Sequence, residues 1–72
     1  MTKTYKIEVD CANCANKMEA AVRKTAGVAG ANVNFMAQKI TVDFDEGVDV
    51  STVMQAARKA AKRIDDDFEI YL

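Results

Sequence analysis

Hydrophobic and polar residues alternate along four short stretches of the chain, and this pattern predicts four strands. The alternating apolar positions are, in order, Tyr5, Ile7 and Val9; Ala31, Val33 and Phe35; Ile40, Val42 and Phe44; and Phe68, Ile70 and Leu72. A period of two residues places successive side chains on opposite faces of a strand, so each strand should bury one face. Only residues 36–38 separate the second stretch from the third, which favours a hairpin.

Two other stretches repeat their apolar residues at helical spacing. The inner faces are Cys14, Met18, Ala21, Val22 and Thr25 in the first, and Val53, Ala57, Ala60, Ala61 and Ile64 in the second. Asn13 is the expected N-cap of the first helix, and Asp49 or Ser51 that of the second, because these side chains accept hydrogen bonds from free amides. Gly27 suits a left-handed C-terminal cap. Three carboxylates at residues 65–67 oppose the helix dipole and should end the second helix.

The order of these elements is strand–helix–strand, repeated once. It predicts an α+β chain with the ferredoxin-like βαββαβ arrangement, in which two helices cover one face of a four-stranded antiparallel sheet. We expect residues 1–72 to form this single domain. The open face of the sheet would carry Lys6, Glu8, Asn32, Asn34, Thr41, Asp43, Glu69 and Tyr71. This polar set should be solvated, and it implies no second, catalytic layer.

Composition excludes several kinds of protein. The chain has two Cys and no His, so these residue types cannot supply a closed four-ligand zinc site, and catalysis by a His base is excluded. The net charge of −1 gives no basic field for nucleic acid. No apolar run is long enough to span a membrane, and residues 1–6 lack a signal-peptide core. We therefore expect a soluble, cytoplasmic, monomeric domain whose thiols stay reduced.

The two cysteines, Cys11 and Cys14, lie between a predicted strand end and a predicted helix start. The helix N-terminus favours thiolate, the form that binds soft and borderline metals. Cys14 begins the inner helix face and should be the more enclosed, whereas Cys11 should be the more exposed. Three interpretations stay open: ordinary small core residues, a dithiol–disulfide redox centre, and an open metal site. The CxxC spacing at a strand-to-helix turn favours the metal site.

The stretch Val9–Glu19 resembles the metal-binding loop and first helix of heavy-metal-associated domains. The resemblance continues through Gly27–Val28, Val33–Phe35 and Lys39–Val42, and so covers essentially the whole chain. Such domains occur as copper chaperones and as N-terminal cytosolic modules of heavy-metal P-type ATPases. The family pattern usually has Gly-Met and one more residue before the first Cys, where this chain has residues 8–10, Glu-Val-Asp.

Asp10 directly precedes Cys11 and bears on the choice of metal. Two thiolates alone suit Cu(I), whereas Zn(II) prefers about four ligands and accepts a carboxylate oxygen. An Asp before CxxC resembles the variant in zinc-, cadmium- and lead-exporting ATPases, which implies Asp10 as a third ligand. The alternative is that Asp10 merely offsets the helix dipole. The resemblance also offers Lys62 as a charge that favours a copper centre, unless Lys62 is an ordinary solvated residue.

The sequence predicts a domain that binds one Zn(II), Cd(II) or Pb(II) ion through Asp10, Cys11 and Cys14. It would pass the ion on by ligand exchange as a non-enzymatic part of a metal-exporting P-type ATPase. The first alternative is a Cu(I) chaperone or Cu(I)-ATPase domain that uses the two cysteines only, and the second is a dithiol redox protein. Expected partners are other domains of the ATPase or a metallochaperone. The basic residues at 58–63 and the acidic ones after them could steer docking.

Overall fold

The six elements follow one another in the predicted order. The computed structural model describes residues 1–72. Its elements are β1 (Thr2–Glu8), α1 (Ala12–Arg23), β2 (Val28–Asn34), β3 (Lys39–Phe44), α2 (Val50–Ile64) and β4 (Glu69–Tyr71). The repeated strand–helix–strand order confirms the α+β, ferredoxin-like prediction, because each predicted change of period coincides with a change of element.

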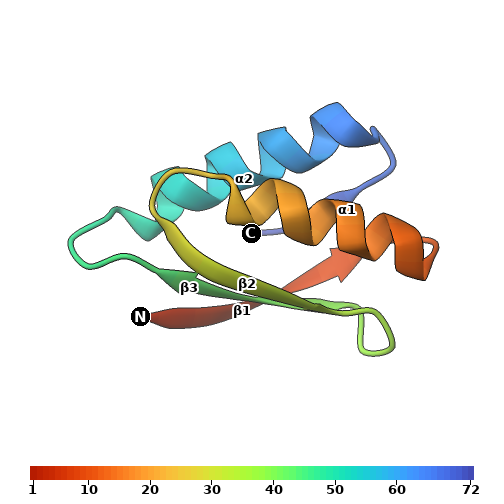
Figure 1. Ribbon diagram of the computed structural model, residues 1–72, viewed down its shortest axis with the longest axis horizontal. Coiled ribbons are helices and arrows are strands. Elements are labelled where there is room, and N and C mark those ends of the chain that lie inside the picture. The colour runs from red at the N-terminus through yellow and green to blue at the C-terminus, as the bar shows by residue number, and fades with distance from the viewer.

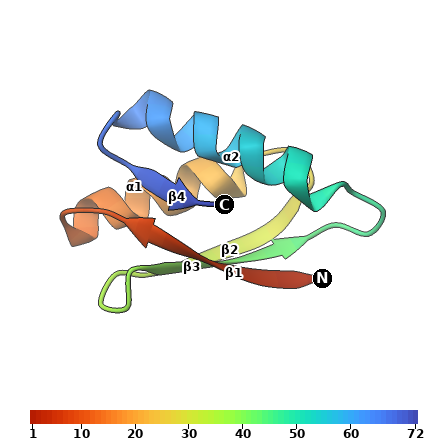
Figure 2. The same ribbon diagram turned by 180° about the vertical axis from the view of Figure 1, so that it is seen from behind.

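The four strands form one sheet in the order β2-β3-β1-β4, and every neighbouring pair is antiparallel. The central strand β1 pairs Tyr5 with Ile40 of β3 and Ile7 with Ile70 of β4. Both helices cover the same face of the sheet, as Figures 1 and 2 show from opposite sides. Neither helix has the length and apolar composition that crossing a bilayer requires.

The core lies between the sheet and the helices, and all of its buried residues are hydrophobic. Its largest fully buried side chains are Phe68, Ile7, Met18, Ile40, Met54, Ile70, Val22 and Val42. The alternation of β1 and β3 and the inner face of α1 therefore identify real core positions. Ala57 and Ala61 are fully buried on α2, where their small side chains leave space for close packing.

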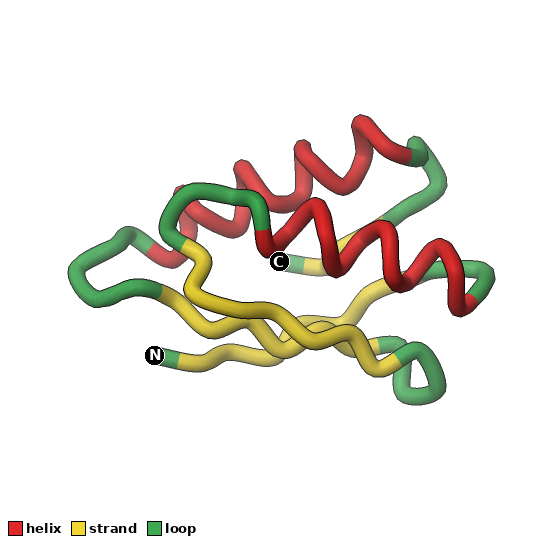
Figure 3. Tube along the Cα trace, in the orientation of Figure 1, coloured by secondary structure: helices red, strands yellow, loops and turns green.

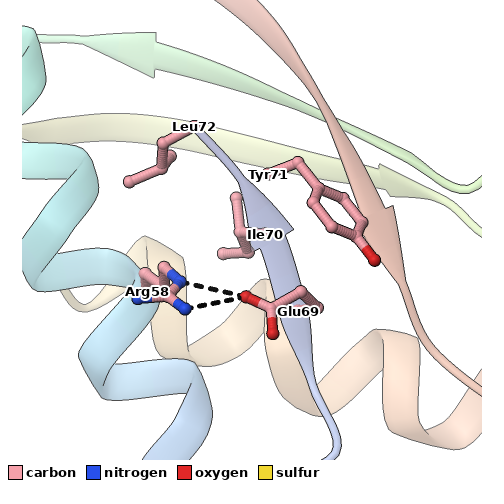
Figure 4. A pocket seen from close by; sticks show the side chains of 5 residues that line it. All are labelled: Arg58, Glu69, Ile70, Tyr71 and Leu72. Atoms are coloured by element: carbon pink, nitrogen blue, oxygen red, sulfur yellow. Dashed lines mark hydrogen bonds and ion pairs between the residues drawn. The ribbon is translucent and has the colours of Figure 1, made fainter.

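Three of the expected orientations are wrong. Ile64 is the last residue of α2 and is 48% exposed, and Leu72 follows the end of β4 and is 61% exposed, so both lie beyond the core. Glu69 does not lie on the open face of the sheet as a solvated group. It is half-buried and pairs with Arg58 at 3.0 Å (Figure 4). It also pairs with Lys62 at 3.1 Å, because the edge strand β4 lies beside α2.

The turns gather at two ends of the molecule (Figure 3). The β1–α1, β2–β3 and α2–β4 connections lie at one end, on the right in Figure 1, and the α1–β2 and β3–α2 connections lie at the other. At the second end Gly27 has a φ of +91°. It is left-handed as predicted, but α1 already ends with Lys24 as its C-cap, so Gly27 belongs to the turn beyond the cap. Asp49, rather than Ser51, caps α2 and accepts a hydrogen bond from the Ser51 amide at 3.2 Å.

Candidate metal centre

The two cysteines lie where the chain leaves β1 and enters α1. Val9 directly follows the last residue of β1, and its side chain is buried in the core, which fixes the start of the loop. Cys11 is extended, with φ −151° and ψ 160°, and its Sγ accepts a hydrogen bond from the Cys14 amide at 3.2 Å. Cys11 is therefore the N-cap of α1. The prediction of Asn13 as the cap is wrong, because the helix begins at Ala12 and Asn13 already lies inside it.

Both thiols are free, and their Sγ atoms are 2.8 Å apart, which is hydrogen-bonding distance. Cys11 is exposed, whereas Cys14 is half-buried and packs against the core, as the sequence predicted. No hollow in the surface is lined by either residue. The pair therefore forms an open site at the N-terminus of α1, which an ion and a second protein can both reach.

The two thiols differ in acidity. The pKa of Cys11 is lowered, first because the Cys14 side chain hydrogen-bonds its sulfur, and then because the Cys14 amide does so as well. The pKa of Cys14 is raised by its hydrogen bond to Cys11, then by desolvation and by the charges of Cys11 and Asp65. The charge of Lys17 lowers the pKa of both. Cys11 is therefore the more acidic thiol of the pair and ionises first.

Asp10 is exposed in the bend before Cys11, and its side chain makes no hydrogen bond or ion pair. The structure contains no group of three or more Cys, Asp or Glu side chains gathered closely enough to hold a metal. The fold thus brings Cys11 and Cys14 together and leaves Asp10 beside them in sequence but outside the cluster. The assignment of Asp10 as the third ligand stays a prediction.

Two charged residues influence the thiols although the sequence did not single them out. Asp65 is the C-cap of α2, and its charge raises the pKa of Cys14. The α2–β4 and β1–α1 connections lie at the same end of the molecule (Figure 1). Its Oδ1 accepts a hydrogen bond from the Asp67 amide at 2.9 Å, which orients the carboxylate. Lys17 lies one helical turn after Cys14, and this spacing was a usable signal. Lys62 pairs with Glu69 instead of standing free in solvent.

Comparison with known proteins identifies the chain by family. Residues 4–63 match the model of the heavy-metal-associated domain. The chain is 46% identical over 50 residues to copper-transporting ATPase 1 of Rhizobium meliloti (strain 1021), a match that covers 69% of the chain and 6% of that ATPase. It is 41% identical over 59 residues to the zinc/cadmium/lead-transporting P-type ATPase of Escherichia coli (strain K12), a match that covers 82% of the chain and 8% of that protein.

Solved structures agree with this assignment. The N-terminal domain of a potential copper-translocating P-type ATPase from Bacillus subtilis, in the Cu(I)-loaded state, superposes with a TM-score of 0.75 and 30% identity, over 99% of this chain and 84% of that one. The CopZ metallochaperone shares the fold with a TM-score of 0.74 at 23% identity, over 99% and 100% of the two chains. The chain therefore belongs to the heavy-metal-associated domains, a family of non-catalytic metal-binding modules found both in metal-transporting ATPases and as separate chaperones.

Proposed function

We propose that residues 1–72 form a single domain that binds one Zn(II), Cd(II) or Pb(II) ion through Cys11, Cys14 and Asp10. The domain hands the ion on by ligand exchange, on the cytoplasmic side of a metal-exporting P-type ATPase. The observation that carries the proposal is the pair of free thiols with sulfurs 2.8 Å apart at the N-terminus of α1, where Cys11 is exposed. Such a pair can hold an ion, yet it leaves coordination positions open for an incoming ligand.

The exchange begins at the exposed side of the site. Cys11 has the lower pKa and the greater exposure, so it is the ligand that both captures the ion and is displaced most easily. Cys14 gives up its proton to solvent as the metal binds, because thiol ligands must be deprotonated. A thiolate of the partner then bonds to the metal before the Cys11–metal bond breaks. The ion stays coordinated throughout, and no oxidation or reduction takes place.

Local charge supports a divalent ion. Two thiolates neutralise Zn(II) or Cd(II) but leave a Cu(I) complex with a charge of −1. The carboxylates of Asp10 and Asp65 lie on this end of the molecule and favour the more positive cargo, whereas Lys17 opposes them. The charge of Lys62 is directed to Glu69 instead of to the thiols. The balance at the site is therefore acidic.

Cu(I) is the second candidate, and it is favoured by a specific observation. The two sulfurs come together with no third Cys, Asp or Glu in the cluster, and a near-linear two-sulfur site is what Cu(I) accepts. Relatives that transport copper and relatives that transport zinc, cadmium and lead both match the chain, so the ion must be chosen by measurement.

The test is a competitive titration of the reduced protein with Zn(II), Cd(II) and Cu(I), carried out on the wild type and on Asp10→Asn. Asp45→Asn is the matched control, since it removes an equally exposed carboxylate at the other end of the molecule. We expect the wild type to bind one divalent ion per chain. Of the two variants, only Asp10→Asn should lose Zn(II) and Cd(II) affinity, by at least about tenfold, because removing even a group that only orients a metal ligand causes a loss of this size. Equal affinities in the two variants, with Cu(I) bound most tightly, would establish the copper function instead.

A further inference from the structure

Gln38 has an unusual backbone conformation. It ends the β2–β3 hairpin, directly before β3, and its φ of 53° makes it the only residue other than glycine with a positive φ. Glutamine has no local reason to adopt this conformation, which Asn and Gly adopt far more readily. A strained conformation of this kind persists only where the surrounding contacts hold it. The contacts of Gln38 therefore indicate what the conformation is for.

Four hydrogen bonds connect Gln38 to its surroundings, one of them from its own main-chain amide to the Phe35 carbonyl at 3.3 Å. Its main-chain carbonyl accepts from the Ile7 amide at 2.9 Å, and its side-chain Oε1 accepts from the Val9 amide at 2.9 Å. Its Nε2 donates to the Phe35 carbonyl at 2.7 Å, which fixes the orientation of the amide group. Both polar atoms of the side chain are thus used, and two of the four bonds hold the chain at and just beyond the end of β1.

The hydrogen bond to the Val9 amide lies just beyond the last residues of β1 that pair with a neighbouring strand. The β1–β3 pairing ends at Lys6 and Lys39, and the β1–β4 pairing ends at Glu8 and Glu69. The amide of Val9 lies beyond both ladders and two residues before Cys11. The Gln38 side chain takes the place of the missing strand partner, across 29 residues of sequence.

We propose that Gln38 is a positioning residue of the metal loop. By holding the Val9 amide it sets the direction in which Asp10 and Cys11 leave the sheet, and so keeps Cys11 Sγ within reach of Cys14. Groups that orient metal ligands without touching the metal commonly change affinity when they are removed. The inference rests on the proposed metal binding at the two thiols. On this inference, Gln38, a residue outside the CxxC loop, slows the release of the bound ion.

Two variants separate positioning from simple stabilisation. Gln38→Asn suits the left-handed backbone better but is one methylene too short to reach the Val9 amide. Gln38→Glu keeps an acceptor for the Val9 amide at the original length, although it loses the Nε2 donor to the Phe35 carbonyl. Asn34→Ala is the matched control, because it removes another side-chain bond of the hairpin, from the Ala37 amide to Asn34 Oδ1 at 3.0 Å, that does not involve Val9.

The measurements are the rate of Cd(II) release to excess chelator, followed by the sulfur-to-cadmium absorption band, and hydrogen exchange of the Val9 amide. We expect Gln38→Asn to release Cd(II) about tenfold faster than the wild type and to expose the Val9 amide, without a loss of thermal stability. Gln38→Glu should restore release to within about threefold of the wild type, and Asn34→Ala should match the wild type, since neither removes the acceptor for Val9.

The outcomes distinguish this inference from the proposed function. A wild-type protein that binds no Cd(II) would overturn both. If the wild type binds Cd(II) and Gln38→Asn releases it at the wild-type rate, the positioning role is overturned and the metal site stands. If Asn34→Ala accelerates release as much as Gln38→Asn does, the hairpin acts by general stabilisation, and the positioning role is likewise overturned.

Discussion

The two ends of this domain are built differently. At the end formed by the α1–β2 and β3–α2 connections, the turn at Gly27 is packed against α2, and a Cβ added to Gly27 would lie 2.7 Å from Val53 Cγ2. At the thiol end, Cys11 is exposed, and its Sγ accepts a hydrogen bond from the Cys14 amide and donates one to Cys14 Sγ. One end is closed by side-chain packing, and the other is kept in shape by polar contacts.

The difference follows from what each end must do. A hydrophobic contact such as that at Gly27 stabilises the fold but excludes any ligand. A site that receives and releases an ion has to remain accessible, so its geometry must come from hydrogen bonds and from the strand and helix on either side. Stability and cargo binding should therefore respond to different substitutions, and three predictions test this separation.

The largest effect is expected at the thiol end, from Cys11→Ser combined with Cys14→Ser. Serine keeps the N-cap hydrogen bond but is not ionised near neutral pH and binds soft metals poorly. Affinity for Zn(II), Cd(II) and Cu(I) should fall by at least about a hundredfold, more than outer-sphere changes cause. The free energy of unfolding of the metal-free protein should fall by only about 1 kcal/mol, because Cys11 is exposed and Cys14 is only half-buried. Stoichiometric binding that survives in the variant would place the site elsewhere.

The next largest effect is expected at the packed end, from Gly27→Ala. The residue would have to hold a φ of +91° and place its Cβ against Val53, a stiff β-branched side chain. The left-handed backbone and the overpacking together should lower the free energy of unfolding by about 3 kcal/mol in urea denaturation. Metal affinity of the folded protein should be unchanged.

Gly30→Ala is the control for this prediction, because a Cβ at Gly30 would meet nothing within 4 Å. Val53→Ala in the Gly27→Ala background should recover the part of the loss that is due to contact, so that the two substitutions are not additive. Equal effects of Gly27→Ala and Gly30→Ala would show that the packed end is less tightly built than the contact distance indicates.

The smallest effect concerns the ion pairs that join α2 to β4. Lys62 and then Arg58 lower the pKa of Glu69, chiefly by hydrogen bonding its carboxylate. The folded pKa is below the unfolded one, so the contribution is complete above the ordinary Glu value of roughly 4.3 and disappears as the pH falls through the lowered folded value. Urea midpoints measured from pH 7 downward should fall less steeply in Glu69→Gln than in the wild type. Parallel profiles would show that solvent screens these pairs completely.

Much of the fold was predictable because it depends on local periodicity. The inward residues of β1 and β3 and the inner face of α1 followed from spacings of two and of three to four residues. The prediction of the buried face of α2 was less accurate. Met54 is buried without having been predicted, and Ile64 is exposed although its spacing suited the inner face. Spacing gives the direction of a side chain, but the core has a finite length, and the last residue of α2 lies beyond it.

The features of the candidate site also fall into those that the sequence predicted and those that it did not. Sequence alone identified Cys11 and Cys14, and it anticipated that Cys14 would be the more enclosed, because both points depend on a strand-to-helix turn of a few residues. It did not reveal that Cys11 itself caps the helix, because a thiol is not among the residues expected there. Nor did it show that Lys62 is engaged by Glu69 of another element.

The chain sequence by itself thus determined the order of the elements, most of the core and the pair of thiols. Only the tertiary structure decided which distant groups lie near the thiols and their loop: the carboxylate of Asp65, which raises the pKa of Cys14, and the side-chain oxygen of Gln38, which accepts from the Val9 amide. The physical reason is the distance along the sequence between the residues that interact. Periodicity and capping involve residues a few positions apart, whereas a charge or hydrogen bond from 29 positions away acts only after the sheet and helices have brought it there.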